Sequence, residues 1–160
     1  MKLKYYVVDA FADRPFTGNP AGVCLLDAWP EDELLQNIAA ENSLAETAYL
    51  VKAGPGYELR WFTPEVEIDL CGHATLASGF IISRFVDQSE ARVDFMTNSG
   101  TLSVWIEGEW LKMDFPARPP VATMIPTRLA GAVRRNFMEP NHSRLLFTLF
   151  HLLIPLACLI

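Results

Sequence analysis

The sequence predicts an α+β fold in which strands surround one central helix. Short β-rich runs alternate with turn residues before and after residues 70–85, and that segment is itself apolar around nearly its whole circumference at helical spacing. A helix that is apolar on all sides is expected to be surrounded by protein. With 160 residues, 51% of them apolar and 20% charged, the chain can form a globular domain with its own core.

The N-terminal part predicts two strands and a helix. Residues 4–11 are a β-rich run, and residues 21–26 form a short strand after the turn at residues 17–20. Residues 29–33 open a helix, because proline and acidic side chains favour its first turn. The apolar side chains of this helix fall on one face at helical spacing: Leu34, Leu35, Ile38 and Ala39.

The middle of the chain predicts two strands and the central helix. Residues 46–51 and 57–62 are strand runs, separated by the strong turn Gly54-Pro55-Gly56. The central helix opens within residues 70–75 and continues to about Phe85. Apolar side chains cover nearly all of its circumference: Ala74, Leu76, Ala77, Phe80, Ile81, Ile82 and Phe85. Residues 92–97, 101–107 and 109–115 then predict three strands with tight connections.

We interpret residues 1–118 as one domain and residues 119–160 as an atypical apolar tail. Residues 1–120 carry 18 of the 19 acidic side chains, whereas residues 121–160 carry four arginines and one glutamate. Residues 145–160 form a nearly uncharged run, which His151 and Pro155 interrupt. This run is shorter than the roughly 18–20 residues that span a bilayer, so membrane anchoring is not favoured. A frameshift would explain the abrupt change in charge and periodicity.

The net charge of −6 argues against a general nucleic-acid binder, which needs a basic face. The three cysteines, Cys24, Cys71 and Cys158, are widely spaced and give no disulfide framework. A reducing compartment and a cytoplasmic location are therefore expected.

Two segments offer candidate functional residues, each with a structural and a functional interpretation. Residues 17–22 are either a plain glycine and proline turn or a small loop that a ligand can approach. Glu46 lies in a run of small and apolar residues. A glutamate in a strand is most often an outward-facing, solvated residue, which the sequence alone favours. The alternative is a partly buried carboxylate that takes and returns a proton near neutral pH.

A third segment, Cys71-Gly72-His73-Ala74-Thr75, opens the central helix. His73 is either a buried structural histidine or a donor or proton relay beside an anion at the helix N-terminus, which Gly72 would leave accessible. Cys71 and His73 could form a metal pair, but no further His or Cys cluster supplies the remaining ligands, so no metal is expected. A phosphate loop, a dinucleotide fingerprint and a nucleophile elbow are absent from the sequence.

Together these segments resemble the PhzF (phenazine-biosynthesis-like) family, within the diaminopimelate-epimerase-like fold. Three stretches carry the resemblance, in matching order and spacing over residues 1–118: VVDAFADRPFTGNPAGV, AAENSLAETAYLV and RWFTPEVEIDLCGHATLASG. Each stretch alone is modest support, whereas three in register are specific. The resemblance implies two similar lobes, each with strands around a central helix, and an active site between them.

The resemblance also implies an activity, an isomerisation by proton shift on a small carboxylated metabolite, with no metal and no organic cofactor. The catalytic residues would be Glu46 and His73. The substrate-binding residues would be Asn19 and Pro20 of the Asn-Pro loop, with Gly72, Ala74 and Thr75 at the helix start. Family members are commonly homodimers.

The family's second lobe, with its Asp and its Gly-Ser-rich loop, has no counterpart in residues 119–160. This chain alone is therefore expected to be inactive. The alternative function is a non-catalytic remnant or an interaction module that binds another chain.

Overall fold

The computed structural model describes residues 3–14, 16–89, 91–116, 152–155 and 158–159. Every described helix and strand belongs to one compact unit, made of Met1–Phe115 and His151–Ile160. The helical elements are α1 (Asp32–Asn42), α2 (Gly72–Ile81) and a π-helical turn, η1 (Ile82–Val86), that continues α2. The strands are β1 (Lys4–Ala10), β2 (Asn19–Leu26), β3 (Glu46–Ala53), β4 (Gly56–Phe62), β5 (Glu67–Ile68), β6 (Arg92–Thr97), β7 (Gly100–Glu107), β8 (Trp110–Asp114), β9 (Leu152–Pro155) and β10 (Cys158–Leu159).

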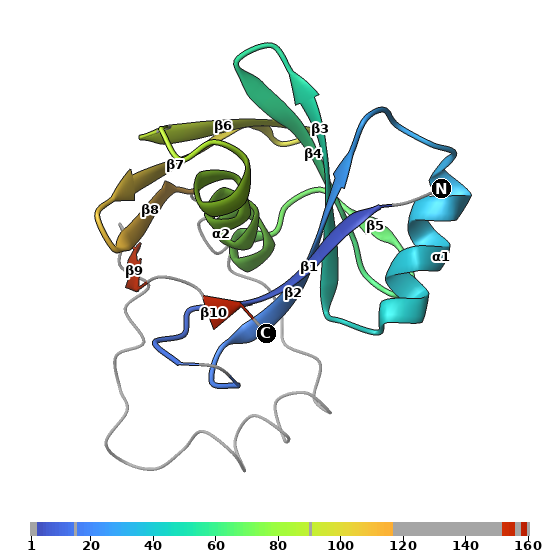
Figure 1. The fold of residues 1–160 in the computed structure, drawn as a ribbon. Helices are drawn as coiled ribbons and strands as arrows, with labels where there is room; N and C mark the ends of the chain where they lie inside the picture. Colours follow the sequence, from blue (N-terminus) through green and yellow to red (C-terminus); the bar gives the residue numbers. More distant parts are fainter. Residues whose placement is uncertain (1–2, 15, 90, 117–151, 156–157, 160) are drawn as a thin grey trace, which may run out of the picture. The chain divides into compact units, whose positions relative to one another are not determined.

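The strands form one mixed, ten-stranded sheet in the order β10-β1-β2-β3-β4-β6-β7-β8-β9, with β5 paired to β4. The pairs β2–β3 and β4–β6 are parallel, and the other described pairs are antiparallel. The sheet curves around α2, with β1–β4 on one side of the helix and β6–β8 on the other (Figure 1). Because α2 contacts β1, β2, β3, β7 and β8, the predicted α+β fold with strands around a central helix is confirmed.

The two faces of the sheet pack against different helices, and strand alternation decides which side chain goes where. On β2 and β3, Val23 and Ala48 belong to the large core around α2. Their neighbours Cys24 and Tyr49 point the other way and belong to a smaller core beneath α1. Both faces of these central strands are therefore buried, which explains their nearly continuous apolar sequence.

Helix α2 is enclosed as predicted, because every residue from His73 to Ile81 is buried. It packs tightly on the sheet at Gly79, where an added Cβ would lie 2.7 Å from Cγ1 of Val104 on β7. The prediction was wrong for Phe85, whose exposed fraction is 53%. Phe85 lies in the π-helical turn beyond the enclosed part and stacks on Tyr6 of β1, with ring centroids 5.6 Å apart.

Helix α1 covers the other face of β3 and β4 with part of its apolar stripe. Leu35 and Ala39 are buried, but Leu34 is 40% exposed. At 3.6 residues per turn, the predicted stripe from Leu34 to Ala39 spans about 140° of the helix circumference. The sheet covers the part that holds Leu35, Ile38 and Ala39, whereas Leu34 lies at the edge of this stripe.

The second strand starts earlier than predicted, at Asn19 rather than Ala21. Asn19 pairs with Ala10, and Pro20 pairs with Asp9 of β1. The parallel strand β3 joins only at Ala21, opposite Glu46. At Pro20 the strand β2 is therefore still an edge on that side, where the missing N–H of proline is tolerated.

Of the predicted apolar tail, residues 119–160, only β9 and β10 are among the described residues. β9 pairs antiparallel with β8, and β10 pairs antiparallel with β1. The domain boundary at residue 118 stays a prediction. Among the described residues, no helix has the length and apolar character needed to cross a bilayer.

Candidate active site

Glu46 is the first residue of β3 and faces α2, not solvent. Helix α1 ends at Ser43, whose left-handed backbone (φ 52°) turns the chain back towards the sheet. Strand alternation then places Glu46 on the same face as Ala48 and Leu50, which pack in the core around α2. Its side chain is only 19% exposed. The outward-facing interpretation favoured by the sequence alone was therefore wrong, and the partly buried carboxylate is what the structure has.

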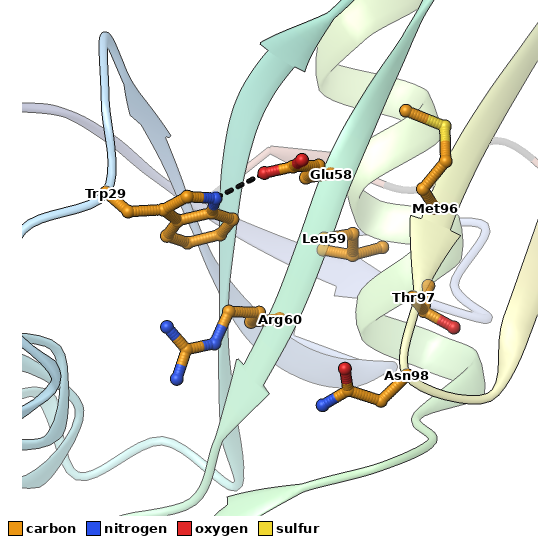
Figure 2. A pocket seen from close by; sticks show the side chains of 7 residues that line it. All are labelled: Trp29, Glu58, Leu59, Arg60, Met96, Thr97 and Asn98. Carbon is orange, nitrogen blue, oxygen red and sulfur yellow. Dashed lines mark hydrogen bonds between the residues drawn. The ribbon is translucent and has the colours of Figure 1, made fainter.

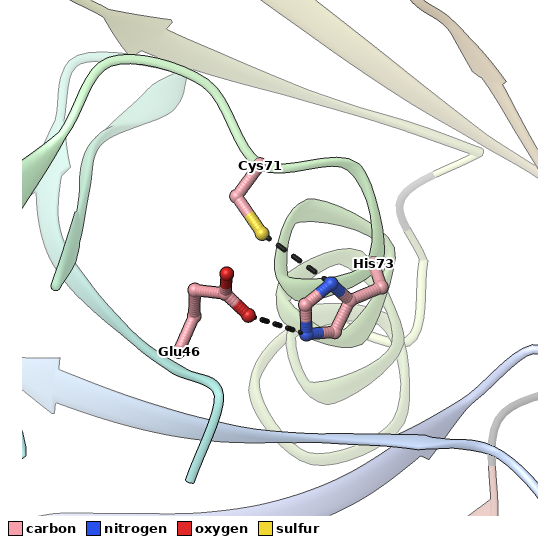
Figure 3. Close-up of side chains that lie close together, drawn as sticks. All are labelled: Glu46, Cys71 and His73. Carbon is pink, nitrogen blue, oxygen red and sulfur yellow. Dashed lines mark hydrogen bonds and ion pairs between the residues drawn. The ribbon is translucent and has the colours of Figure 1, made fainter. Parts of the chain in front are cut away.

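His73 is the partner of this carboxylate. It is the second residue of α2, and its side chain is 9% exposed. Its Nε2 atom lies 3.1 Å from Oε2 of Glu46 (Figure 3). Both atoms are buried and lie within ion-pair distance of each other, and neither has a hydrogen-bond partner among the described residues. The two predicted catalytic residues, 27 positions apart in the sequence, thus meet where the start of β3 faces the start of α2.

Cys71 completes a row of three side chains. It precedes α2 as the N-cap residue, in an extended conformation (φ −143°, ψ 118°). Its Sγ lies 3.4 Å from Nδ1 of His73, so the imidazole stands between a thiol and a carboxylate (Figure 3). Sequence reasoning considered Cys71 only as a metal ligand and missed this contact. The available signal was the Cys-x-His spacing at a helix start, which brings both side chains to the same end of the helix.

Burial sets the protonation states of the thiol and the imidazole. It lowers the pKa of His73, and the nearby charge of Glu46 opposes this shift only in part. Burial also raises the pKa of the Cys71 thiol to about 12, although the backbone N–H groups of Ala74 and His73 act against the rise. Near neutral pH the site therefore holds a neutral imidazole and an un-ionised thiol.

The N-terminus of α2 offers backbone donors beside this row. No side chain caps it through a hydrogen bond, so the first-turn N–H groups, which begin at Gly72, lack a capping side chain. An added Cβ on Gly72 would meet only Met113 and Phe115, at 3.7 Å, which is ordinary contact. Packing therefore does not require glycine at this position.

The other predicted binding residues differ in whether their side chains are open to a ligand. Ala74 and Thr75 are fully buried, and the Thr75 hydroxyl donates to the carbonyl of Cys71 at 2.5 Å. Their side chains support the helix start and are not open to a ligand. By strand alternation, Asn19 lies on the same face as Ala21 and Glu46, whereas Pro20 lies on the opposite face.

Asp9, which sequence reasoning did not single out, holds the loop before Asn19. It is 2% exposed, and its Oδ2 accepts a hydrogen bond of 2.7 Å from the backbone N–H of Phe16. Phe11 and Phe16 in this loop both have a left-handed backbone, with φ of 62° and 66°. Such conformations persist only where the surrounding structure fixes them. The signal in the sequence was an aspartate that interrupts an apolar strand.

Three possible metal ligands come together in this site, contrary to the sequence-based argument that no cluster exists. The donor atoms of Glu46, Cys71 and His73 lie within 4.8 Å of one another. However, the thiol faces Nδ1 and the carboxylate faces Nε2, on different edges of the ring (Figure 3). One ion can bind only one of these nitrogens. The arrangement therefore suits a row of hydrogen bonds better than a metal centre, and a metal-free site stays a prediction.

A pocket on the other face of the sheet lacks groups for such chemistry. It has a volume of about 240 Å³ and is lined by Trp29, Glu58, Leu59, Arg60, Met96, Thr97 and Asn98 (Figure 2). Both charged side chains of the lining already make hydrogen bonds. Glu58 accepts a 2.5 Å hydrogen bond from Trp29, and Arg60 bonds to Asp32 and Glu67. The lining holds no histidine or cysteine, so this pocket lacks a row of titratable side chains like the one at Glu46.

Comparison with known proteins identifies the family of this chain. The family model for phenazine biosynthesis-like proteins, PhzC-PhzF, matches residues 8–129, past the predicted boundary at residue 118. An uncharacterized isomerase of Pseudomonas aeruginosa is 53% identical over 133 residues, which are 83% of this chain and 51% of the relative. The phenazine biosynthesis-like domain-containing protein of Homo sapiens is 39% identical over 127 residues, 74% of this chain and 44% of the relative.

Solved structures give the same assignment. A phenazine biosynthesis PhzC/PhzF protein from Clostridium difficile superposes with a TM-score of 0.74 at 49% identity, over 82% of this chain and 51% of that one. A hydroxyproline epimerase from Agrobacterium vitis shares the fold alone, with a TM-score of 0.52 at 9% identity, over 69% of this chain and 40% of that one. This chain spans about half the length of the curated relatives it matches. The family match and these relatives show that the chain belongs to the phenazine biosynthesis-like PhzC-PhzF family.

Proposed function

We propose that this chain supplies the proton-transfer residues of a PhzF-type isomerase, which acts without a cofactor on a small carboxylated metabolite. The observation that carries the proposal is the buried contact of 3.1 Å between Oε2 of Glu46 and Nε2 of His73. Relatives at 53% and 51% identity are named isomerases, which supports the reaction class.

Glu46 is the general acid and base in this proposal. Oε2 is buried against His73, so it is not one of the exposed atoms of the side chain. The second oxygen, Oε1, is then the one that takes a proton from a substrate carbon and returns it to another. Because the imidazole is neutral, it holds the carboxylate by a hydrogen bond without adding a positive charge that would weaken its basicity.

The substrate carboxylate or a developing anion would bind at the N-terminus of α2. Its first-turn N–H groups lie next to Glu46 and have no capping side chain, which suits an anion. Asn19 is placed on the same face as Glu46 and is the polar side chain we assign to the substrate. To Gly72, Ala74 and Thr75 we assign only backbone roles, because they form the start of the helix whose N–H groups are the donors.

Location and assembly follow the family as further proposals. Cys24 and Cys71 are free, buried thiols, which supports a reducing, cytoplasmic compartment. We propose a homodimer, because family members are commonly homodimers.

A non-catalytic role as an interaction module is the second candidate. It is favoured by one observation, that the chain spans about half the length of its relatives.

Solvent exchange separates the two candidates. The full chain is compared with a fusion, in which residues 1–115 replace the matched half of the Pseudomonas aeruginosa relative. Each protein is incubated in D₂O with a panel of small unsaturated ring carboxylic acids, and proton NMR follows the loss of C–H signals. The proposal expects exchange by the fusion with at least one acid, and little or none by the chain alone. A folded fusion that exchanges no acid would favour the interaction module.

A further inference from the structure

The imidazole of His73 has two polar neighbours of different kinds, one on each ring nitrogen. Nε2 lies 3.1 Å from a Glu46 carboxylate oxygen, and Nδ1 lies 3.4 Å from the Cys71 sulfur (Figure 3). A neutral imidazole carries one N–H and one lone pair, on different nitrogens. One neighbour can therefore accept a hydrogen bond from the ring, while the other can donate one to it.

The partners themselves decide which nitrogen carries the hydrogen. An ionised carboxylate can only accept, so Nε2 must donate to Glu46. Nδ1 is then an acceptor inside the protein and needs a donor. Among the described residues, the hydrogen-bond partner found for Nδ1 is the thiol of Cys71, and S–H is a weak donor.

We propose that Cys71 is a positioning residue, whose thiol donates to Nδ1 of His73 and fixes the ring in the Nε2–H tautomer that holds Glu46. The consequence for catalysis rests on the proposed function of Glu46, whereas the tautomer itself does not. In this role Cys71 does not touch the substrate and does not transfer its proton.

The surroundings of Cys71 keep the thiol in place. The residue is 6% exposed, and its carbonyl accepts the hydrogen bond from the buried Thr75 hydroxyl. Its thiol is un-ionised near neutral pH, because burial raises its pKa to about 12, so the S–H remains available as a donor. The opposite arrangement, in which Nδ1–H donates to sulfur, would require a protonated Glu46 that donates to Nε2. The tautomer of His73 therefore distinguishes the two directions.

Nitrogen NMR of the full chain tests this inference. Two-bond ¹H–¹⁵N spectra at pH 7.5 separate protonated from unprotonated ring nitrogens. The chain has three histidines, so His73→Gln assigns the signals. Cys71→Ala removes the donor, and Cys71→Ser keeps one. Cys24→Ala is the matched control, because Cys24 is also a fully buried thiol but packs in the core beneath α1.

The expected wild-type spectrum shows a protonated Nε2 and an unprotonated, hydrogen-bonded Nδ1. Cys71→Ala should shift the Nδ1 signal downfield, towards that of a free unprotonated nitrogen, and Cys71→Ser should reverse most of this shift. Cys24→Ala should leave both signals in place. A protonated Nδ1 in the wild type would overturn the inference, and so would an unchanged Nδ1 signal in Cys71→Ala. If Cys71→Ala does not fold, the tautomer of the wild type and the Nδ1 signal of Cys71→Ser still test the inference. A failure of the exchange assay would leave these spectra unaffected.

Discussion

Two glycines of α2 predict opposite effects of the same substitution. An added Cβ on Gly79 would lie 2.7 Å from Cγ1 and 3.1 Å from Cβ of Val104, a fully buried residue of β7. Carbon atoms in good contact are about 3.5–4.0 Å apart, so Gly79→Ala must push the helix away from the sheet. On Gly72 the nearest atoms would be 3.7 Å away, and Gly72→Ala fits without movement.

The magnitudes follow from two opposing terms. Overfilling a packed core costs about 1–3 kcal/mol, and alanine is favoured over glycine within a helix by about 1 kcal/mol. Because the contact at Gly79 is far below normal, we expect the free energy of unfolding to fall by about 1–2 kcal/mol in Gly79→Ala. For Gly72→Ala we expect no change, or a gain of up to about 1 kcal/mol.

Urea unfolding of the full chain measures both effects, with the fluorescence of the buried Trp61 as one signal. The double variant Gly79→Ala/Val104→Ala removes the two γ carbons that cause the clash. Its destabilisation should be smaller than the sum of the single effects, by about 1 kcal/mol or more. The packing account is refuted if Gly79→Ala is as stable as Gly72→Ala, or if the two changes in the double variant are additive.

Three further predictions concern the site. Burial lowers the pKa of His73, so the unfolded chain binds a proton at this residue more readily, and stability is lost as the pH falls through the unfolded pKa of about 6.5. In urea unfolding, the free energy of unfolding should therefore fall less between pH 7.5 and pH 5.5 in His73→Gln than in the wild type. An equal fall in both proteins would count against a neutral, buried His73. Burial raises the pKa of Cys24 to about 11 and that of Cys71 to about 12, so both thiols are un-ionised at pH 8. In a folded Cys158→Ser variant, they should react with a disulfide reagent at pH 8 at least about 100-fold more slowly than in denaturant. Fast reaction of either thiol in the folded protein would show that it ionises readily. Purified protein should contain no zinc, and chelator should leave its Tm unchanged; stoichiometric zinc by elemental analysis would make Cys71 and His73 ligands instead.

Most of the fold could be predicted from local periodicity. The apolar circumference of residues 70–85 predicted an enclosed helix, and His73 to Ile81 are all buried. The predicted runs for β3 and β4 begin within one residue of the observed strands. Phe85 was misplaced, because periodicity shows which side chains share a face but not how far the neighbouring element extends over it; Leu34 shares the predicted face of α1 but lies beyond the cover of the sheet.

The site was harder to predict, since it depends on pairings that the sequence does not display. Local propensity favoured a solvated Glu46, whereas the parallel register of Ala21 with Glu46 turns this carboxylate towards α2. The family resemblance named Glu46 and His73 as catalytic residues but not their contact, which the structure shows at 3.1 Å. The contact of Cys71 with His73 depends on the extended backbone at the helix start, which residue types alone do not fix.

The central claim is that Oε1 of Glu46 transfers the proton while His73 holds the other oxygen, Oε2. Its most direct test is the rate of deuterium incorporation by the fusion protein when Glu46 is replaced by glutamine. Glu46→Gln keeps an oxygen that can accept from Nε2 of His73, so the fold should persist, but an amide cannot accept a proton at neutral pH. Glu41→Gln, on the exposed end of α1, is the matched control. We expect Glu46→Gln to lower the rate at least about 100-fold and Glu41→Gln to leave it unchanged. A folded Glu46→Gln variant that exchanges at the wild-type rate would remove Glu46 from the mechanism.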